Sequence, residues 1–177
     1  MCKYYAGIGS RSTPPNILKL MKDIGFFMAS KGWILRSGRA AGADTWFEKG
    51  CNEWWHNNSK PGYPCPKEIF TKYDIGDDLH SQTALQMAKK IHPAWHRCNL
   101  TVQKLHARNM FQIHGRDLQV PIQSVICWTP EGKLVGGTRT AIIAATDIGR
   151  KVYNLGNEAT VEYICNRFKF NQRRYDS

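Results

Sequence analysis

Short apolar segments alternate with longer amphipathic ones along the chain, and this alternation constrains the fold more than any other feature. Five segments are apolar enough for buried strands: residues 4–8, 33–35, 67–70, 124–128 and 152–155. The segments between them carry apolar residues at helical spacing. Strands that are apolar on both faces and alternate with helices form parallel sheets. We therefore predict a Rossmann-like α/β fold with a parallel sheet of about five strands and helices on both faces.

Capping and breaking residues predict where the helices begin and end. The first helix should begin at Thr13-Pro14-Pro15, because threonine can cap free amides and proline suits the first helical position, and Gly32 should end it. Two helices are expected at residues 81–91 and 93–112, with a break at His92-Pro93. The others are expected after Asp44, at residues 141–148 and at residues 158–168.

A chain of 177 residues is long enough for one domain, so we expect residues 1–177 to form a single unit with a basic tail at residues 166–177. No apolar run is long enough to cross a bilayer, and the first residues lack the pattern of a secretion signal. We expect a cytoplasmic protein with no membrane partner. Its 6 cysteines include no Cys-x-x-Cys pair, which predicts reduced thiols.

The charge balance favours an anionic partner. Lys and Arg number 25 and Asp and Glu 14, which gives a net charge of +11. Nucleic acid is one candidate for such a partner. Part of the excess lies in the tail, where the simpler interpretation is a solvated segment that keeps the chain soluble: Arg167, Lys169, Arg173 and Arg174.

Three strand-to-helix junctions are rich in small residues, at residues 7–11, 37–44 and 136–139. In an open parallel sheet a ligand binds beyond the carboxyl ends of the strands, where helix N-termini offer free amides to anions. Glycine allows the backbone to approach such a ligand closely. The junctions together predict a cradle for phosphate or ribose, although each alone could be a tight structural turn.

Arginine lies at or beside each junction, at Arg11, Arg36, Arg39 and Arg139, and Arg108 ends a long predicted helix. The planar guanidinium matches phosphate geometry, so several on one edge would hold a diphosphate, a triphosphate, a cyclic nucleotide or a strand backbone. The alternative is that each pairs with a nearby carboxylate. Trp128 follows a strand directly and is expected either to wall the pocket or to pack in the core.

Two common cofactor motifs are absent. The segment Gly7-x-Gly9 has Ser12 where the dinucleotide-binding pattern has a third glycine, and the next strand ends in Arg36-Ser37 rather than in an acid. No Gly-Lys-Ser or Gly-Lys-Thr of a Walker A loop is present. His92 and His96 have the spacing of a helical metal pair, but Pro93 should leave His92 outside the helix. We expect no cofactor and no metal.

The three junctions together resemble the SLOG superfamily, which includes the DprA, YpsA and LOG-like proteins. The likeness is carried by Tyr5-Ala6-Gly7-Ile8-Gly9-Ser10-Arg11, Ser37-Gly38-x-Ala40-x-Gly42-Ala43-Asp44 and Gly136-Gly137-Thr138, and it is greatest to short single-domain DprA-like proteins of phages. The resemblance implies a Rossmann-like fold that binds a nucleotide, a nucleotide-derived signal or single-stranded DNA. It also implies a homo-oligomer.

One departure from the LOG pattern bears on catalysis. The cytokinin-activating LOG enzymes carry a glutamate after the glycine-rich motif, and it serves in cleavage of the N-glycosidic bond. Ala141 stands at that position here. Alanine cannot move a proton, so hydrolysis by this route needs another acid. Asp44 is the best substitute; it could accept ribose hydroxyls, assist cleavage, or simply cap its own helix.

Three hypotheses about function follow. The first is binding of a nucleotide or nucleotide-derived signal for sensing or sequestration, which in a phage protein would capture a host immune signal. The second is a nucleotide N-glycosidase or phosphoribohydrolase that uses Asp44, and the third is a DprA-like single-stranded DNA-binding protein. The residues expected to form the ligand site are Gly9, Ser10, Arg11, Ser37, Gly38, Arg39, Gly42, Ala43, Asp44, Arg108, Asn109, Trp128, Gly136, Gly137 and Thr138.

Overall fold

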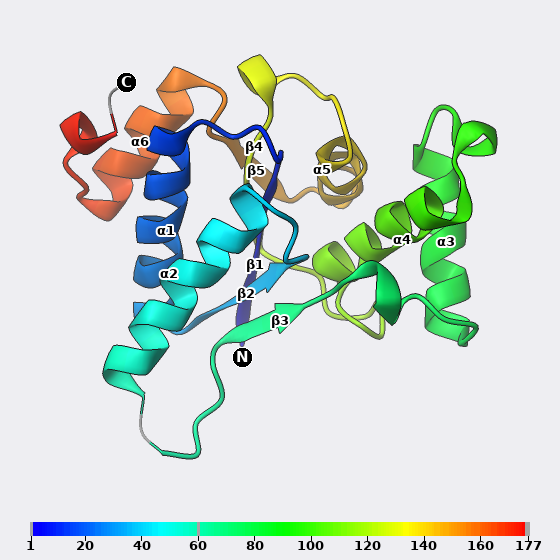
Figure 1. Ribbon diagram of the computed structural model, residues 1–177, viewed down its shortest axis with the longest axis horizontal. Helices are drawn as coiled ribbons and strands as arrows, with labels where there is room; N and C mark the ends of the chain where they lie inside the picture. The colour runs from blue at the N-terminus through cyan, green and yellow to red at the C-terminus, as the bar shows by residue number, and fades with distance from the viewer. Residues whose placement is uncertain (1, 60, 176–177) are drawn as a thin grey trace.

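A five-stranded parallel sheet forms the centre of the molecule (Figure 1). The computed structural model describes residues 2–59 and 61–175. The strands are β1 (Lys3–Gly9), β2 (Trp33–Ser37), β3 (Lys67–Ile69), β4 (Ser124–Trp128) and β5 (Lys151–Asn154). Their order across the sheet is β3-β2-β1-β4-β5, and every neighbouring pair is parallel. This arrangement confirms the predicted Rossmann-like α/β fold.

Helices cover both faces of the sheet. The α-helices are α1 (Pro15–Ser30), α2 (Ala43–Asn58), α3 (Leu79–Ile91), α4 (Leu100–His114), α5 (Thr138–Asp147) and α6 (Glu158–Phe168). Short 3₁₀ turns lie at η1 (Lys72–Asp74), η2 (Trp95–Arg97), η3 (Pro130–Gly132) and η4 (Gln172–Arg174). Helices α1, α2 and α6 pack on one face, and α3, α4 and α5 lie on the other (Figure 1). No helix in the described residues has the length and apolar character needed to span a membrane.

The alternation of side chains along β1 divides the interior into two cores. Tyr5 points into the core beneath α1, α2 and α6. There its ring packs edge to face against that of Phe47, with the ring centroids 6.4 Å apart. Ala6 and Ile8 point into the core beneath α3, α4 and α5. Both cores exclude water from the central strands, which explains why the strand sequences are apolar throughout rather than alternating.

Helices α1 and α2 touch through their backbones. A Cβ atom at Gly50 would lie 1.9 Å from the carbonyl oxygen of Lys22, and one at Gly25 would lie 2.3 Å from the carbonyl oxygen of Phe47. Real side chains do not tolerate such distances, so glycine is required where these helices cross. The contact fixes α1 and α2 against each other.

Helix α1 begins at Pro15, within the predicted start, but the predicted cap of α1 and the predicted start of α4 are wrong. Thr13 does not cap α1; its hydroxyl donates to the carbonyl oxygen of Ser10 at 2.7 Å, and Pro14 is the N-cap. Helix α4 begins at Leu100 rather than at residue 93, because Asn99 accepts the amide of Val102 at 3.0 Å and caps it.

The segment predicted as a solvated tail is docked as far as it is described. Residues 166–168 belong to α6, and Phe168 stacks on Phe27 of α1 with ring centroids 4.5 Å apart. Tyr175 is 3% exposed, and its hydroxyl donates to Asp23 at 2.6 Å. Residues 176–177 of the predicted tail lie outside the described part of the chain. Aromatic residues within the basic segment therefore anchor it to α1.

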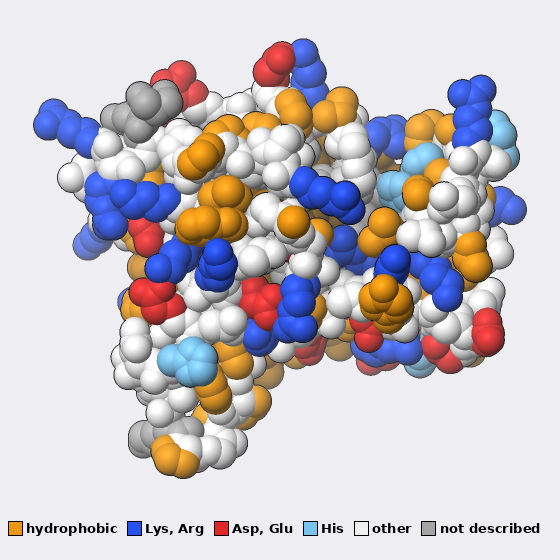
Figure 2. Space-filling model, viewed as in Figure 1, with side chains coloured by type: hydrophobic (Ala, Val, Ile, Leu, Met, Phe, Trp, Pro, Cys, Tyr) orange, Lys and Arg blue, Asp and Glu red, His pale blue; other side chains and the backbone are white. Residues whose placement is uncertain are grey.

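The surface charge is mixed rather than concentrated. Lys and Arg side chains are spread over the face shown in Figure 2, with Asp and Glu side chains between them. Several cations are paired, as in the 2.7 Å contact between Lys67 and Glu48 and the 2.5 Å contact between Lys22 and Glu53. On this face the net positive charge does not form one continuous stripe.

Candidate functional site

A cavity of about 520 Å³ opens at the carboxyl ends of β1 and β4. These strands are neighbours, but the chain leaves β1 towards β2 and leaves β4 towards β5, so the strand order reverses between them. Such a reversal opens a crevice between the two strand-to-helix junctions, which is where open α/β sheets bind ligands. Of the expected site residues, those that line the cavity are Gly9, Ser10, Arg11, Asp44, Arg108, Asn109, Gly136, Gly137 and Thr138.

Some expected residues support the cavity from beneath. Ser37 is fully buried, and its hydroxyl donates to the carbonyl oxygen of Gly7 at 2.6 Å. Gly38 leaves room for Arg108, since a Cβ atom at Gly38 would lie 1.2 Å from the guanidinium. Gly42, with a φ of +88°, lies against the backbone of Ser10, and Ala43 is buried in the core.

Other predicted site residues point elsewhere. Arg39 makes two contacts with Glu48, at 2.6 and 3.0 Å, and does not line the cavity. Arg36 is buried and bonds Glu68 at 2.6 Å, so both follow the alternative of pairing with a carboxylate. Trp128 packs against the core of α1 and α2 instead of walling the cavity. Arg139 donates to the carbonyl oxygen of Ile91 at 3.5 Å and does not line the cavity either, so within the described residues the predicted convergence is limited to Arg11 and Arg108.

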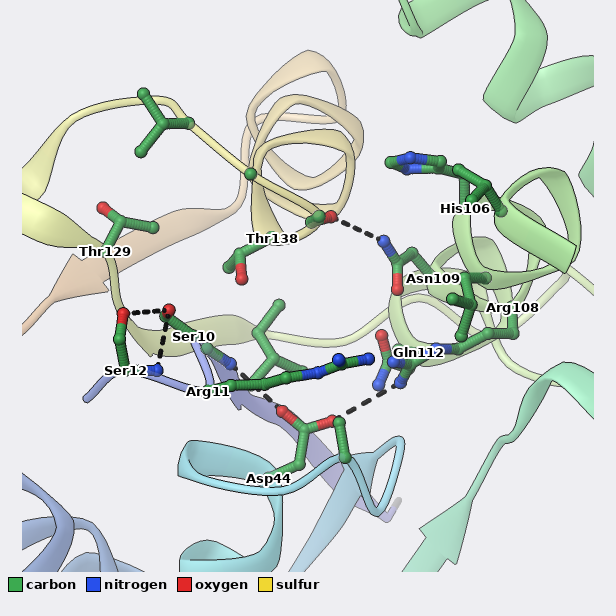
Figure 3. Close-up of a pocket in the computed structure, with 18 of the residues that line it drawn as sticks. Ser10, Arg11, Ser12, Asp44, His106, Arg108, Asn109, Gln112, Thr129 and Thr138 are labelled. Carbon is green, nitrogen blue, oxygen red and sulfur yellow. Dashed lines mark hydrogen bonds and ion pairs between the residues drawn. The ribbon is translucent and has the colours of Figure 1, made fainter. Parts of the chain in front are cut away.

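Asp44 joins the loops that carry the cavity floor (Figure 3). It is 2% exposed, and its carboxylate accepts the amides of Gly9 at 3.1 Å and Gly38 at 3.0 Å and the guanidinium of Arg108 at 3.4 Å. Burial raises the pKa of Asp44, while Arg108 and the two amides oppose that rise. The N-cap of α2 is Gly42, so Asp44 does not cap its own helix.

A chain of polar contacts continues from Arg108 to the β4–α5 loop. In the orientation that satisfies its neighbours, the amide of Gln112 accepts from Arg108 at 2.7 Å and from Gly38 at 2.9 Å and donates to Asn109 at 3.0 Å. Asn109 in turn donates to the carbonyl oxygen of Gly137 at 3.0 Å. Asp44, Arg108, Gln112 and Asn109 thus hold three junctions in one fixed geometry.

Above this floor the cavity has polar groups that remain available. Arg11 is exposed and makes no ion pair with any other described residue, and its side chain extends across the cavity in Figure 3. The hydroxyls of Ser10 and Ser12 lie 2.9 Å apart at one side. At the other side, α5 begins after Gly137 with no side-chain cap, and Gly136, Gly137 and Thr138 line the cavity there.

The remaining wall is apolar and was missed by sequence reasoning. It is formed by Ile8, Val102, Leu105, Pro130 and Val135. The signal for part of it was the spacing on α4: Val102, Leu105, Asn109 and Gln112 recur at intervals of three or four residues, so they share the helix face that also presents Arg108. A charged floor with an apolar wall suits an amphiphilic ligand.

His106 forms one edge of the cavity. Its Nδ1 lies 2.8 Å from the hydroxyl of Thr140, and burial, together with the neighbouring His92 and Arg108, lowers the pKa of His106 to about 4. The imidazole is therefore neutral at physiological pH.

Comparison with protein-family models, with curated proteins and with solved structures finds no significant match. The likeness to the SLOG superfamily therefore stays an expectation based on the three sequence motifs.

Proposed function

We propose that the protein binds a nucleotide or a nucleotide-derived signal in the cavity between β1 and β4, for sensing or sequestration. The observation that carries the proposal is the unpaired guanidinium of Arg11, which crosses a cavity of about 520 Å³ beside the uncapped start of α5. Volumes of this size are typical of small-molecule sites. Guanidinium groups and free helix amides are the usual ligands of phosphate.

The apolar wall supports a ligand that is more than a free phosphate. Val102, Leu105 and Val135 line the same cavity as the Ser10–Ser12 segment. A phosphate held by Arg11 and the α5 amides would leave an attached ribose and base beside these apolar side chains. Burial of that apolar surface adds to affinity and would separate nucleotides from inorganic anions.

Asp44 favours binding over hydrolysis. Both of its oxygens accept hydrogen bonds from the protein, and one of them also accepts the guanidinium of Arg108. A catalytic acid has to reach the bond it protonates. The contacts of Asp44 instead assign it to positioning the loops, which supports retention of the ligand without turnover.

Single-stranded DNA is the less favoured ligand. A strand-binding protein needs a positively charged groove with stacking platforms along the backbone. The Lys and Arg side chains on the face in Figure 2 are interspersed with acidic ones, and Trp128 is partly buried and packs against the core. A homo-oligomer stays a prediction from the resemblance, which light scattering on the purified protein tests.

The proposal is tested by calorimetric titration of wild-type protein and of Arg11→Ala with a panel of mono-, di-, tri- and cyclic nucleotides. We expect Arg11→Ala to weaken binding of the preferred nucleotide by about tenfold or more, because a charge-assisted hydrogen bond contributes about 1.5–3 kcal/mol. Arg167→Ala is the matched control: Arg167 is exposed on α6, away from the cavity, and the same charge is lost.

The alternatives predict different results from the same material. Chromatography of the mixtures should recover the nucleotide unchanged, whereas release of free base would favour a glycosidase. An oligonucleotide that binds more tightly than any nucleotide, with an affinity that falls steeply with salt, would favour a strand-binding protein. Equal effects of Arg11→Ala and Arg167→Ala would contradict the proposed site.

A further inference from the structure

Three side chains with metal-binding atoms meet between α3 and α4: His92, Cys98 and His106. One ligand atom from each lies within 4.8 Å of the others. His92 directly follows α3, Cys98 directly follows η2, and His106 lies in the second turn of α4. The connection between the two helices therefore brings a thiol and two imidazoles together, and none of them is needed to hold the polar floor of the cavity.

The spacing of the ligand atoms is close to that of a tetrahedral metal site. Cys98 Sγ lies 3.8 Å from Nδ1 and 3.9 Å from Nε2 of His92, and the two imidazole centroids are 4.4 Å apart. Zinc bonds of about 2.0–2.1 Å to nitrogen and about 2.3 Å to sulfur place tetrahedral ligand atoms about 3.3–3.6 Å from one another. Small side-chain rotations bring the three atoms to these distances.

The surroundings of His106 are those of an oriented metal ligand. Its Nδ1 lies 2.8 Å from the hydroxyl of the buried Thr140, which fixes the ring and leaves Nε2 as the coordinating atom. Metal-bound histidines almost always have such a partner on the other ring nitrogen. His92 is held less firmly, since only the amide of Ala94, at 3.2 Å, donates to its Nδ1. A metal ion at that nitrogen would replace this contact.

We propose that His92, Cys98 and His106 bind one divalent transition-metal ion of the Zn²⁺ class, with water in the fourth position. Two imidazoles and a thiolate suit such an ion, whereas Mg²⁺ and Ca²⁺ prefer oxygen ligands. The negative charge of the Cys98 thiolate offsets one of the two positive charges of the metal ion, which matters in a protein that is already basic. Because His106 also lines the cavity, the ion would lie at the cavity edge. The site does not depend on what the cavity binds.

The spacing His92-x-x-x-His96 suggests His96 as the second metal ligand, but His96 is not part of the cluster. His96 is exposed on η2, while the partner of His92 comes from α4, 14 residues along the chain. His96→Ala is therefore a matched control, since it removes an imidazole from the same loop without touching the three ligands. Cys2→Ser is the corresponding control for loss of a thiol, because Cys2 is exposed at the other end of the chain.

The experiment uses the full chain, stripped with a chelator and titrated with Zn²⁺ or Co²⁺ alone. We expect one Zn²⁺ per chain in native mass spectrometry and, with Co²⁺, a thiolate-to-metal charge-transfer band. Cys98→Ser should abolish that band, and loss of His92 or Cys98 should weaken Zn²⁺ binding by more than about 100-fold. Thr140→Val should weaken it by about 10–100-fold, as expected for an outer partner. The two control variants should bind as the wild type does.

Two results would overturn the site. One is wild-type protein that takes up no Zn²⁺ at stoichiometric concentration. The other is a set of ligand variants that keep the wild-type affinity. Circular dichroism of each variant establishes that it is folded, and His92→Gln, a conservative change at a half-buried position, replaces Cys98→Ser if that variant does not fold.

Discussion

Replacement of Asp44 by alanine should be among the most destabilising single changes in this chain. The substitution removes the acceptor for the amides of Gly9 and Gly38 and leaves the guanidinium of Arg108 buried without its carboxylate. Breaking a buried pair by removing one partner costs about 3–5 kcal/mol. We expect a loss near the lower end, because Gln112 still accepts from Arg108 and Gly38.

A double-mutant cycle isolates the cause of that loss. Arg108→Met removes the cation but keeps an unbranched side chain in its place, and the double variant Asp44→Ala/Arg108→Met leaves no unpaired charge. Residues that share one polar network show coupling energies of about 0.5–3 kcal/mol. We therefore expect the double variant to be less destabilised than the sum of the single variants. Asp77→Ala, at an exposed acid that makes no ion pair with another described residue, controls for the loss of a negative charge.

Urea unfolding followed by tryptophan fluorescence measures each variant, since the chain has 6 tryptophans. Free energies of unfolding come from the midpoints and slopes of the transitions. An Asp44→Ala variant that loses less than about 1 kcal/mol, or a cycle that is additive within about 0.5 kcal/mol, would refute the positioning role of Asp44. Nucleotide affinity should fall together with stability, because the same carboxylate holds both junctions.

Further predictions concern the scaffold. Gly50→Ala should lower the free energy of unfolding by about 1–3 kcal/mol, because the new methyl meets the Lys22 carbonyl. Gly76→Ala should not, because its methyl would make only an ordinary contact of 3.7 Å with Asp78, and urea titration measures both. Burial raises the pKa of Cys127 from 9.0 to about 12, so the unfolded state ionises first and stability should fall by about 1.4 kcal/mol per pH unit across that interval; unfolding midpoints measured as pH rises test this, and a flat profile contradicts it. Tyr175→Ala should cost about 3–5 kcal/mol, as for other buried aromatic truncations, and a calorimetric melting temperature that does not change would mean that the segment after α6 is not docked.

The fold could be predicted because the features that indicate it lie within short segments of the sequence. Each strand is a short apolar run, and each junction carries glycine where the chain turns into a helix, so strand positions and the layered architecture followed from the sequence. The start of α4 was missed because its cap, Asn99, lies after a histidine–proline break that looked like the helix start. The proline at residue 93 instead precedes a 3₁₀ turn.

The site could be predicted only in part, because pairing across the fold is not local. Arg11 and Arg39 look alike in the sequence, each beside a glycine junction. Arg39 pairs with Glu48 in the second turn of α2, while Arg11 makes no ion pair among the described residues. The cluster proposed to bind a metal ion was missed for the same reason, since His106 joins His92 only when α4 folds back beside α3.

The close crossing of α1 and α2 has a mechanical consequence for the cavity. Helix α2 begins beside the cavity, which Asp44 lines, and its glycine-mediated backbone contact with α1 prevents one helix from sliding along the other. The side of the cavity next to α1 and α2 is therefore expected to keep its shape. The opposite side, residues 130–137, is exposed, includes Glu131 at a φ of +53°, and is held by a side-chain hydrogen bond from Asn109. Movement around a bound ligand is therefore expected in the part of this loop before Gly137, whose carbonyl oxygen Asn109 holds, rather than in the sheet or in α1 and α2.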